Sequence, residues 1–268
     1  MNILDTRSEE AFAAGHLKGS VNLPWPQLKT LQNQLPPPGA VLQLVADHSD
    51  SERVIEWLIS KGYHIERVLS WPLPSFLPLE TGKSPHFLWQ PNPLLKAFLH
   101  WPEVQEQSPL KILDLGCGGG REAVYAALLG HQVTAIEHKP MVLQRAQQLA
   151  EAHQVSIEFK HCDLLTQGCF PLAQFDVIMG FRFLERALFP NIKKALKPGG
   201  WVLWQTFSQG VEQFGSPKNP RFILKSGELA QIFSGFQVII DRIETLDDGR
   251  PIASFVAQKQ KGENNGEH

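Results

Sequence analysis

Cysteine is scarce in this chain of 268 residues. Residues 1–116 contain none, and the three that follow are Cys117, Cys162 and Cys169. They form no Cys-x-x-Cys pair, and an odd number is a poor basis for a disulfide framework. We therefore expect partly buried thiols, no zinc or other metal site, and a reducing compartment, the cytoplasm.

Long apolar runs and an excess of charge of one sign are also missing. No apolar run reaches the roughly 18–20 residues that a membrane span needs. The net charge of −2 does not indicate a general nucleic-acid or membrane binder. The first residues are not a basic and then apolar leader, so we expect no signal peptide. With 43% hydrophobic and 19% charged residues, the chain is typical of globular proteins, and its length predicts about two domains.

The second half contains a glycine-rich turn between a predicted strand and a predicted helix. The segment "KILDLGCGGGREAVYAALLGHQVTAIEHKP" predicts a strand at 112–115, a helix at 121–129 and a second strand at 133–136, closed by Glu137 and His138. Glycines let the backbone turn sharply and approach a ligand closely. An acidic residue about 20 positions on is placed to accept hydrogen bonds from ribose hydroxyls.

A dinucleotide or another nucleotide cofactor would suit such a turn. The dinucleotide pattern requires a third glycine, and Arg121 stands in that position, which disfavours a nicotinamide-dependent oxidoreductase. The turn instead resembles motif I of class I S-adenosylmethionine-dependent methyltransferases, "D-L-G-C-G-x-G". The matching residues are Asp114, Leu115, Gly116, Cys117, Gly118 and Gly120. This resemblance implies that Asp114 orients the methionine end of the cofactor and that Glu137 binds the ribose.

The resemblance extends over residues 110–258. It implies that Asp163 and Leu164, after a third strand, lie beside the adenine, although Asp163 is equally suited to cap the strand end. Gly180 and Phe181, at the end of a fourth strand, complete the predicted cofactor site. The last two strands match the antiparallel hairpin of the family. The implied fold is an α/β, Rossmann-like, seven-stranded sheet. Within the family, the residue pattern of this chain is similar to that of the tellurite-resistance-type branch.

Basic residues are concentrated between 181 and 225, a segment that contains eight Lys or Arg residues and only two acidic residues. Arg182 and Arg186 follow the fourth strand, four residues apart, as if on one helical face. We assign them to an acceptor pocket that favours an anionic or electron-rich substrate. Residues 214–229 are a candidate lid over this pocket, or an ordered cover without substrate contact.

The first half predicts a strand ending at Asp5, a short helix, and a second strand at 41–45 followed by a loop and a helix. The segment "ILDTRSEEAFAAGHLKGSVNLPW" resembles the rhodanese-like motif "D-x-R-x-x-x-E-F-x-x-G-H-I-x-G-A-x-N-I-P", and the resemblance covers residues 1–71. Active members carry a nucleophilic cysteine where this chain has Ala46. Asp47 and Asp50 would also repel the anions that such loops attract. We therefore expect an inactive, non-catalytic module.

The sequence thus predicts a rhodanese-like domain at 1–71, an ordered Pro- and aromatic-rich connector at 72–109, a methyltransferase domain at 110–258 and a flexible tail at 259–268. The predicted function is methyl transfer from S-adenosylmethionine to a small molecule, with no membrane partner and no residue identified as a general base. Two alternatives stay open: an RNA or protein methyltransferase that docks through the first domain, and a non-catalytic S-adenosylmethionine-binding protein. Nucleic acid is a possible but disfavoured partner.

Overall fold

The computed structural model describes residues 2–261 and divides between Gln90 and Pro91 into two compact units. We call residues 1–90 unit 1 and residues 91–268 unit 2, and we describe each by itself. None of the helices within residues 2–261 is long and apolar enough to cross a membrane.

Unit 1 is built on a parallel four-stranded sheet with the order β3-β1-β4-β5. Its strands are β1 (Asn2–Asp5), β3 (Val21–Asn22), β4 (Val41–Ala46) and β5 (His64–Ser70). Helix α1 (Glu9–Ala14) follows β1, and helix α2 (Ser51–Ser60) follows β4, as the sequence predicts. Val54 and Leu58 of α2 pack against the sheet because they recur at helical spacing.

A buried ion pair joins the strand end and the loops of unit 1. The guanidinium of Arg7 donates to both carboxylate oxygens of Asp5, at 2.7 Å for the shortest bond, and to the carbonyl oxygen of Gly15. The indole ring of Trp71 lies 3.6 Å from the guanidinium carbon. Both charged side chains are almost fully buried, so each depends on the other for neutralisation.

The Pro-rich segment 72–109 contributes to both units. Its strand β6 (Leu79–Glu80) pairs with β2 (His16–Leu17) in unit 1, where Leu88 also joins the core. Helices α3 (Pro93–Phe98) and α4 (Pro102–Gln105) belong to unit 2. Trp89 and Phe98 are buried, in keeping with the aromatic content of the segment.

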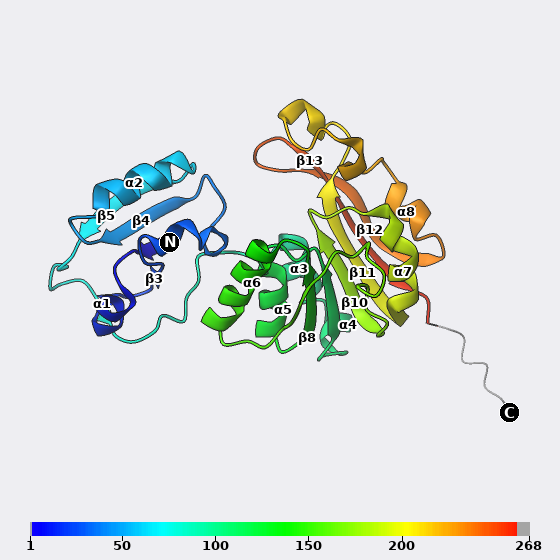
Figure 1. Cartoon of the computed structure of the whole chain (residues 1–268), viewed down its shortest axis with the longest axis horizontal. Helices are drawn as coiled ribbons and strands as arrows, with labels where there is room; N and C mark the ends of the chain where they lie inside the picture. Colours follow the sequence, from blue (N-terminus) through cyan, green and yellow to red (C-terminus); the bar gives the residue numbers. More distant parts are fainter. Residues whose placement is uncertain (1, 262–268) are drawn as a thin grey trace. The chain divides into compact units, whose positions relative to one another are not determined.

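Unit 2 contains a seven-stranded sheet with the order β12-β13-β11-β10-β7-β8-β9 (Figure 1). The strands are β7 (Lys111–Leu115), β8 (Gln132–Glu137), β9 (Glu158–His161), β10 (Phe175–Phe181), β11 (Leu196–Phe207), β12 (Phe236–Thr245) and β13 (Pro251–Lys259). Only β13 runs antiparallel to its neighbours β11 and β12, and the other pairs are parallel. The predicted α/β class, the seven strands and the antiparallel terminal hairpin are confirmed.

Helices cover both faces of this sheet (Figure 1). Helices α5 (Arg121–Leu128) and α6 (Pro140–Ala152) pack with α3 and α4 on one face. Helices α7 (Phe189–Ala195) and α8 (Glu228–Ile232) pack on the other. Strand β13 includes Lys259, the first residue of the predicted tail, whereas residues 262–268 of that tail lie outside the described part of the chain.

One sequence prediction about cysteine is wrong. Cys162 and Cys169 are joined by a disulfide with a Cα–Cα distance of 5.8 Å. Two reverse turns between them bring the sulfurs together, since the backbone N–H of Thr166 donates to Asp163 and that of Cys169 donates to Thr166. Cys117 is the free, buried cysteine.

Replacing Arg7 with alanine should destabilise unit 1 by about 3–5 kcal/mol, because Asp5 would remain buried without its cation. Native-state hydrogen exchange of residues 2–46 in the whole chain measures this loss. Lys18→Ala is the matched control, because its pair with Glu80 is exposed and such pairs contribute no more than about 1 kcal/mol. Equal hydrogen-exchange protection in the Arg7 and Lys18 variants would contradict the conclusion that the buried Arg7–Asp5 pair stabilises unit 1.

Candidate active site

A cleft of about 610 Å³ lies at the carboxyl ends of β7, β8, β9 and β10 in unit 2. Residues at or just after each strand end form its walls, because parallel strands end at the same edge of the sheet. The lining residues are Gly116, Gly118, Ile136, Glu137, His138, Lys139, Val142, Cys162, Asp163, Leu164, Leu165, Phe181, Arg182, Phe183, Leu184, Glu185 and Phe222.

The glycine turn between β7 and α5 makes one end of the cleft. Gly118 has a φ of +55°, and a Cβ atom built there would meet nothing within 4 Å, so the turn leaves open space beside its backbone. Gly120 has a φ of +80°, and its Cβ would lie only 2.7 Å from the Cβ of Ala146 in α6. Gly118 therefore keeps room for a ligand, and Gly120 lets α5 and α6 approach each other.

Glu137 ends β8 with its carboxylate directed at the turn. Its oxygens accept hydrogen bonds from the backbone N–H groups of Gly118 (3.2 Å) and Lys139 (2.9 Å). Nδ1 of His138 lies 3.0 Å from the same carboxylate. Oε1 is occupied by Lys139 and His138, whereas Oε2 accepts from Gly118 and can accept a further bond, so Glu137 is able to bind a hydroxyl group in the cleft.

Asp114 lies in β7, two residues before Gly116, and its carboxyl group is buried. Its Oδ2 atom has no hydrogen-bond partner among the described residues. Burial, followed by the nearby carboxylates of Glu122 and Glu137, raises the pKa of Asp114 well above its usual value. A buried acceptor without a partner is costly, and a cationic group such as an ammonium would satisfy it.

One wall of the cleft is aromatic and carries the guanidinium of Arg182. Phe181, Phe183 and Phe222 line it, and Phe183 lies against the glycine turn, where a Cβ on Gly116 would meet its ring at 2.6 Å. Arg182 has a φ of +56°, which is uncommon for a residue with a side chain. Its guanidinium lies over the ring of Phe207, 4.5 Å from the centroid.

The backbone of Arg182 is held by a polar network. Its N–H donates to the carbonyl oxygen of Gln205 at 2.8 Å. The side chain of Gln205 accepts a bond from Asn92 (2.6 Å) and donates to Ser254 (2.7 Å). Desolvation and the neighbouring Arg250 lower the pKa of Arg182, which nevertheless stays protonated at neutral pH. Within residues 2–261, no carboxylate pairs with this guanidinium.

Arg186 does not join Arg182 in the cleft, and the predicted helix that would align them is wrong. Residues 182–185 are not helical, and Arg186 begins a short 3-10 turn. Its guanidinium pairs with Glu228 and donates to the carbonyl oxygens of Arg221 and Ile223. Arg221 in turn pairs with Glu185. Arg186 therefore fixes the predicted lid segment, which contributes Phe222 to the cleft.

The structure brings most of the predicted cofactor residues to the cleft. They are Gly116, Gly118, Glu137, His138, Asp163, Leu164 and Phe181. Asp114, Cys117, Gly120 and Gly180 do not line the cleft. Asp114 and Cys117 are buried behind the glycine turn, and a Cβ at Gly180 would meet Trp204 at 2.6 Å. Asp163 also caps its own turn, since its Oδ1 accepts from Leu165 at 3.0 Å.

Sequence reasoning missed several lining residues. Lys139, Phe183 and Leu184 could be found by extending each strand end by two or three residues. Phe222 lies within the segment 214–229, which the sequence predicts to be a lid or cover over the pocket, but strand ends do not single it out, because it comes from a 3-10 turn. No group of three or more His, Cys, Asp or Glu residues suited to a metal ion occurs in the described residues.

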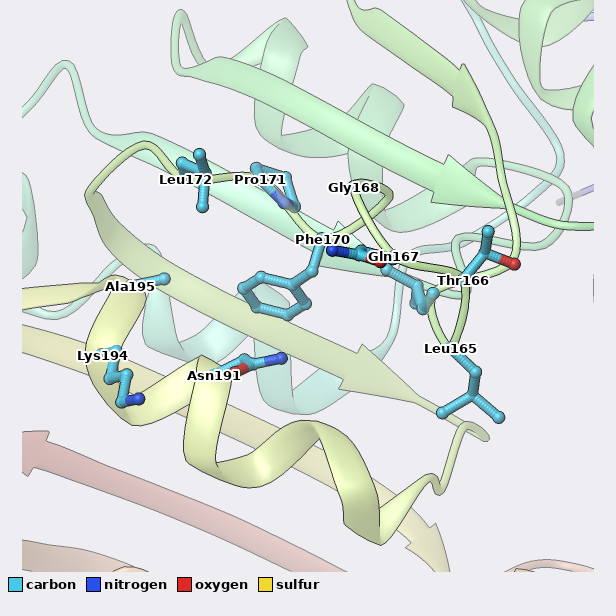
Figure 2. A pocket seen from close by; sticks show the side chains of 11 residues that line it. Leu165, Thr166, Gln167, Gly168, Phe170, Pro171, Leu172, Asn191, Lys194 and Ala195 are labelled. Carbon is cyan, nitrogen blue, oxygen red and sulfur yellow. The ribbon is translucent and has the colours of Figure 1, made fainter.

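A second cavity of about 430 Å³ adjoins the cleft and shares Leu164 and Leu165 with it. It lies between the segment 164–172 and helix α7. Figure 2 shows Phe170 directed toward α7, with the amide of Asn191 facing the ring. Its walls are mostly apolar, and Lys194 lies at its edge.

Comparisons with known proteins find a different family model for each of the two segments of the chain. The family model of a rhodanese-like domain matches residues 1–71, and that of a methyltransferase domain matches residues 112–200. The structure of TehB from Haemophilus influenzae is 24% identical, covers 59% of this chain and 60% of its own, and has a TM-score of 0.50. The similarity to TehB supports the fold of unit 2 alone.

Two curated proteins are similar in sequence. An uncharacterized protein of Schizosaccharomyces pombe is 24% identical over 96% of this chain and 93% of its own length. The ubiquinone biosynthesis O-methyltransferase of Albidiferax ferrireducens is 34% identical over 47% of this chain. The match spans 52% of that enzyme, so about half of its length has a counterpart here.

The unpaired carboxyl group of Asp114 gives a pH-dependent stability. Because its pKa is raised on folding, the native chain binds more protons than the unfolded chain above about pH 4, and stability falls as pH rises through the native pKa. In ligand-free protein, urea midpoints should therefore decline less with pH in Asp114→Asn than in the wild type. Asp241→Asn, at an exposed position of β12, should follow the wild type. Parallel curves for Asp114→Asn and the wild type would refute this cause.

Proposed function

Because the chain joins a rhodanese-like domain to a methyltransferase domain, we propose that it transfers a methyl group from S-adenosylmethionine to a small anionic acceptor. The observation that carries the proposal is the buried oxygen of Asp114, which lacks a partner beside a glycine turn with open space. The combination suits a ligand with both a cationic end and a nucleoside.

The residues of the cleft fit this cofactor by their chemistry. Asp114, buried directly behind the glycine turn, would neutralise the ammonium of its methionine end, and the remaining acceptor position on Oε2 of Glu137 would take a ribose hydroxyl. Oδ1 of Asp163 accepts from Leu165, and its Oδ2 would accept a hydrogen bond from the adenine amino group. When bound, S-adenosylmethionine supplies a methyl group on a sulfonium, which is ready for in-line displacement.

Arg182 and the surrounding rings are proposed to bind the acceptor. The arginines near it are already neutralised, since Arg186, Arg221 and Arg250 pair with Glu228, Glu185 and Asp248. Arg182 is left to attract an anion. Phe181, Phe183 and Phe222 would exclude water and hold an apolar body of the acceptor.

No residue is assigned as a general base. The acidic residues that line the cleft, Glu137, Asp163 and Glu185, already accept hydrogen bonds or form an ion pair. An acceptor that binds as an anion needs no proton removed, so positioning beside the sulfonium is sufficient.

Unit 1 is proposed to serve as a folded module without sulfur transfer. Ala46 ends β4 at the position where the family resemblance places the nucleophilic cysteine, and the thiolate has no substitute in persulfide chemistry. A docking role on an RNA or protein acceptor is the alternative. Salt-dependent RNA binding by the whole chain, together with RNA methylation, would favour it over a small-molecule acceptor.

Calorimetry of the whole chain tests the cofactor. We expect S-adenosylmethionine to bind and NAD not to bind. Asp114→Asn should weaken binding by about tenfold or more, because a hydrogen bond to a charged group contributes roughly 1.5–3 kcal/mol. Asp241→Asn, far along the sheet edge in β12, should bind like the wild type. Tight NAD binding without binding of the sulfonium would overturn the proposal.

Arg182→Gln tests the acceptor end. With a panel of small carboxylates, phenols and amines, turnover is followed as release of S-adenosylhomocysteine. The variant should lose about 10–100-fold in kcat/KM for anionic acceptors, since it removes a charge-assisted contact. Arg242→Gln is the matched control, because Arg242 lies on β12 and pairs with Glu244. An unchanged efficiency in Arg182→Gln would remove Arg182 from the site.

A further inference from the structure

We propose that Cys162 and Cys169 form a reversible redox site that controls the affinity of the cleft for its cofactor. The proposal rests on the proposed function, because it concerns binding of S-adenosylmethionine or its demethylated product. Sequence spacing gave no reason to pair these cysteines, and the disulfide closes a loop of residues 162–169. We call this segment the disulfide loop.

The disulfide loop forms part of the cofactor end of the cleft. Cys162, Asp163, Leu164 and Leu165 all line it. The backbone N–H of Cys162 donates to the carbonyl oxygen of Glu137 at 3.2 Å, which ties the start of the loop to the end of β8. A change in the loop therefore acts on the position of Asp163 and Leu164, which are proposed to contact the adenine.

Two cavities adjoin the disulfide loop. Cys162 to Leu165 line the cleft, and Leu164 to Gly168 of the same loop line the second cavity; Figure 2 shows Leu165 to Gly168 around it. Residues 165–168 are exposed. Cys162 and Leu164 pack against the core of unit 2, whereas the exposed middle of the loop has room to rearrange when its closure is removed.

Little besides the disulfide closes the loop. Among the described residues, Leu165 donates its N–H to Oδ1 of Asp163 within the loop. Two turn bonds also form there, from the N–H of Thr166 to the carbonyl oxygen of Asp163 (2.8 Å) and from the N–H of Cys169 to that of Thr166 (3.1 Å). Opening the cross-link restores conformational freedom to these residues. The reduced protein would hold its loop in the binding conformation for a smaller fraction of the time, and its apparent affinity falls by that fraction.

The two sulfurs are suited to exchange, whereas Cys117 is not. Cys162 and Cys169 are half-buried near the surface loop, within reach of a small dithiol. Burial raises the pKa of Cys117 far above its usual value, and this keeps its thiol unreactive. A thiolate of the reductant attacks one sulfur of the disulfide, and its second thiol then closes the reductant's own disulfide. Two protein thiols are released for one dithiol oxidised.

The ambient redox state would then set the affinity. In the reducing cytoplasm predicted from the sequence, thiol pools keep such a pair open, and a disulfide-forming oxidant closes it. The oxidised form is the one that the structure describes, with the loop closed against the cleft.

Titration of S-adenosylhomocysteine into the whole chain by calorimetry tests the proposal. One sample is treated with oxidised glutathione, the other with dithiothreitol, and free thiols are counted in denaturant. We expect one thiol and tight binding in the oxidised sample. In the reduced sample we expect three thiols and a Kd about tenfold higher, as when the binding-competent fraction falls to about a tenth.

Cys169→Ser is the matched variant, because Cys169 does not line the cleft. In dithiothreitol it should bind like the reduced wild type, and oxidation should not raise its affinity, because the lone Cys162 can form only a mixed disulfide with glutathione, which releases one glutathione thiol. Since the variant retains Cys117, any effect of the reductant through that residue would persist and be seen. Three free thiols after oxidation, or equal Kd values for the two wild-type samples, would overturn the redox site alone. Absence of binding in both samples would overturn the proposed function and this site with it. The comparison of wild-type samples stands even if the variant fails to fold.

Discussion

The parallel order of β7, β8, β9 and β10 is the constraint on which the candidate site depends. It delivers four strand ends to one edge of the sheet, and each end leaves its polar residues there. A glycine turn after β7 then frees the space that side chains would fill, while Glu137 binds the N–H of Gly118 and keeps that turn in place. The antiparallel β13 lies two strands away from β10 and closes the sheet without disturbing this edge. Fold and site therefore follow from one arrangement of strands.

Local patterns predicted much of this arrangement, and long-range pairing accounts for what they missed. The strand, turn and helix around Gly118 have a recognisable pattern within about thirty consecutive residues. Both the fold of unit 2 and the position of Glu137 could therefore be predicted from the sequence. Arg186 was misplaced because its partner, Glu228, lies 42 residues away and leaves no periodic trace. Cys162 and Cys169 are near in sequence, yet only the turns between them decide whether their sulfurs meet. Sequence reasoning thus found the residues that a strand end presents and missed those that a tertiary contact redirects.

Unit 1 contains residues whose replacement would leave a buried charge unsatisfied, and it also contains a strand end where no polar group depends on the side chain. Asp5, Arg7 and Trp71 form a buried charged cluster that cannot lose one member without leaving another unsatisfied. Ala46, in contrast, is a small buried side chain with no polar partner to maintain. Replacement of Ala46 leaves no polar group unsatisfied, while replacement within the charged cluster leaves a buried charge without its partner and costs about 3–5 kcal/mol. The side chain at this strand end is therefore not tied to the charged cluster.

The unpaired oxygen of Asp114 has a consequence for the lifetime of the protein in a cell. A ligand that neutralises this oxygen binds the folded chain and not the unfolded one, and so adds to the free energy of unfolding. Degradation acts mainly on unfolded molecules, so a shift of about 1–2 kcal/mol changes protein abundance several-fold. The amount of this protein in the cell would then rise and fall with the supply of its own ligand. The rate at which the protein is degraded would depend on whether the cleft is filled.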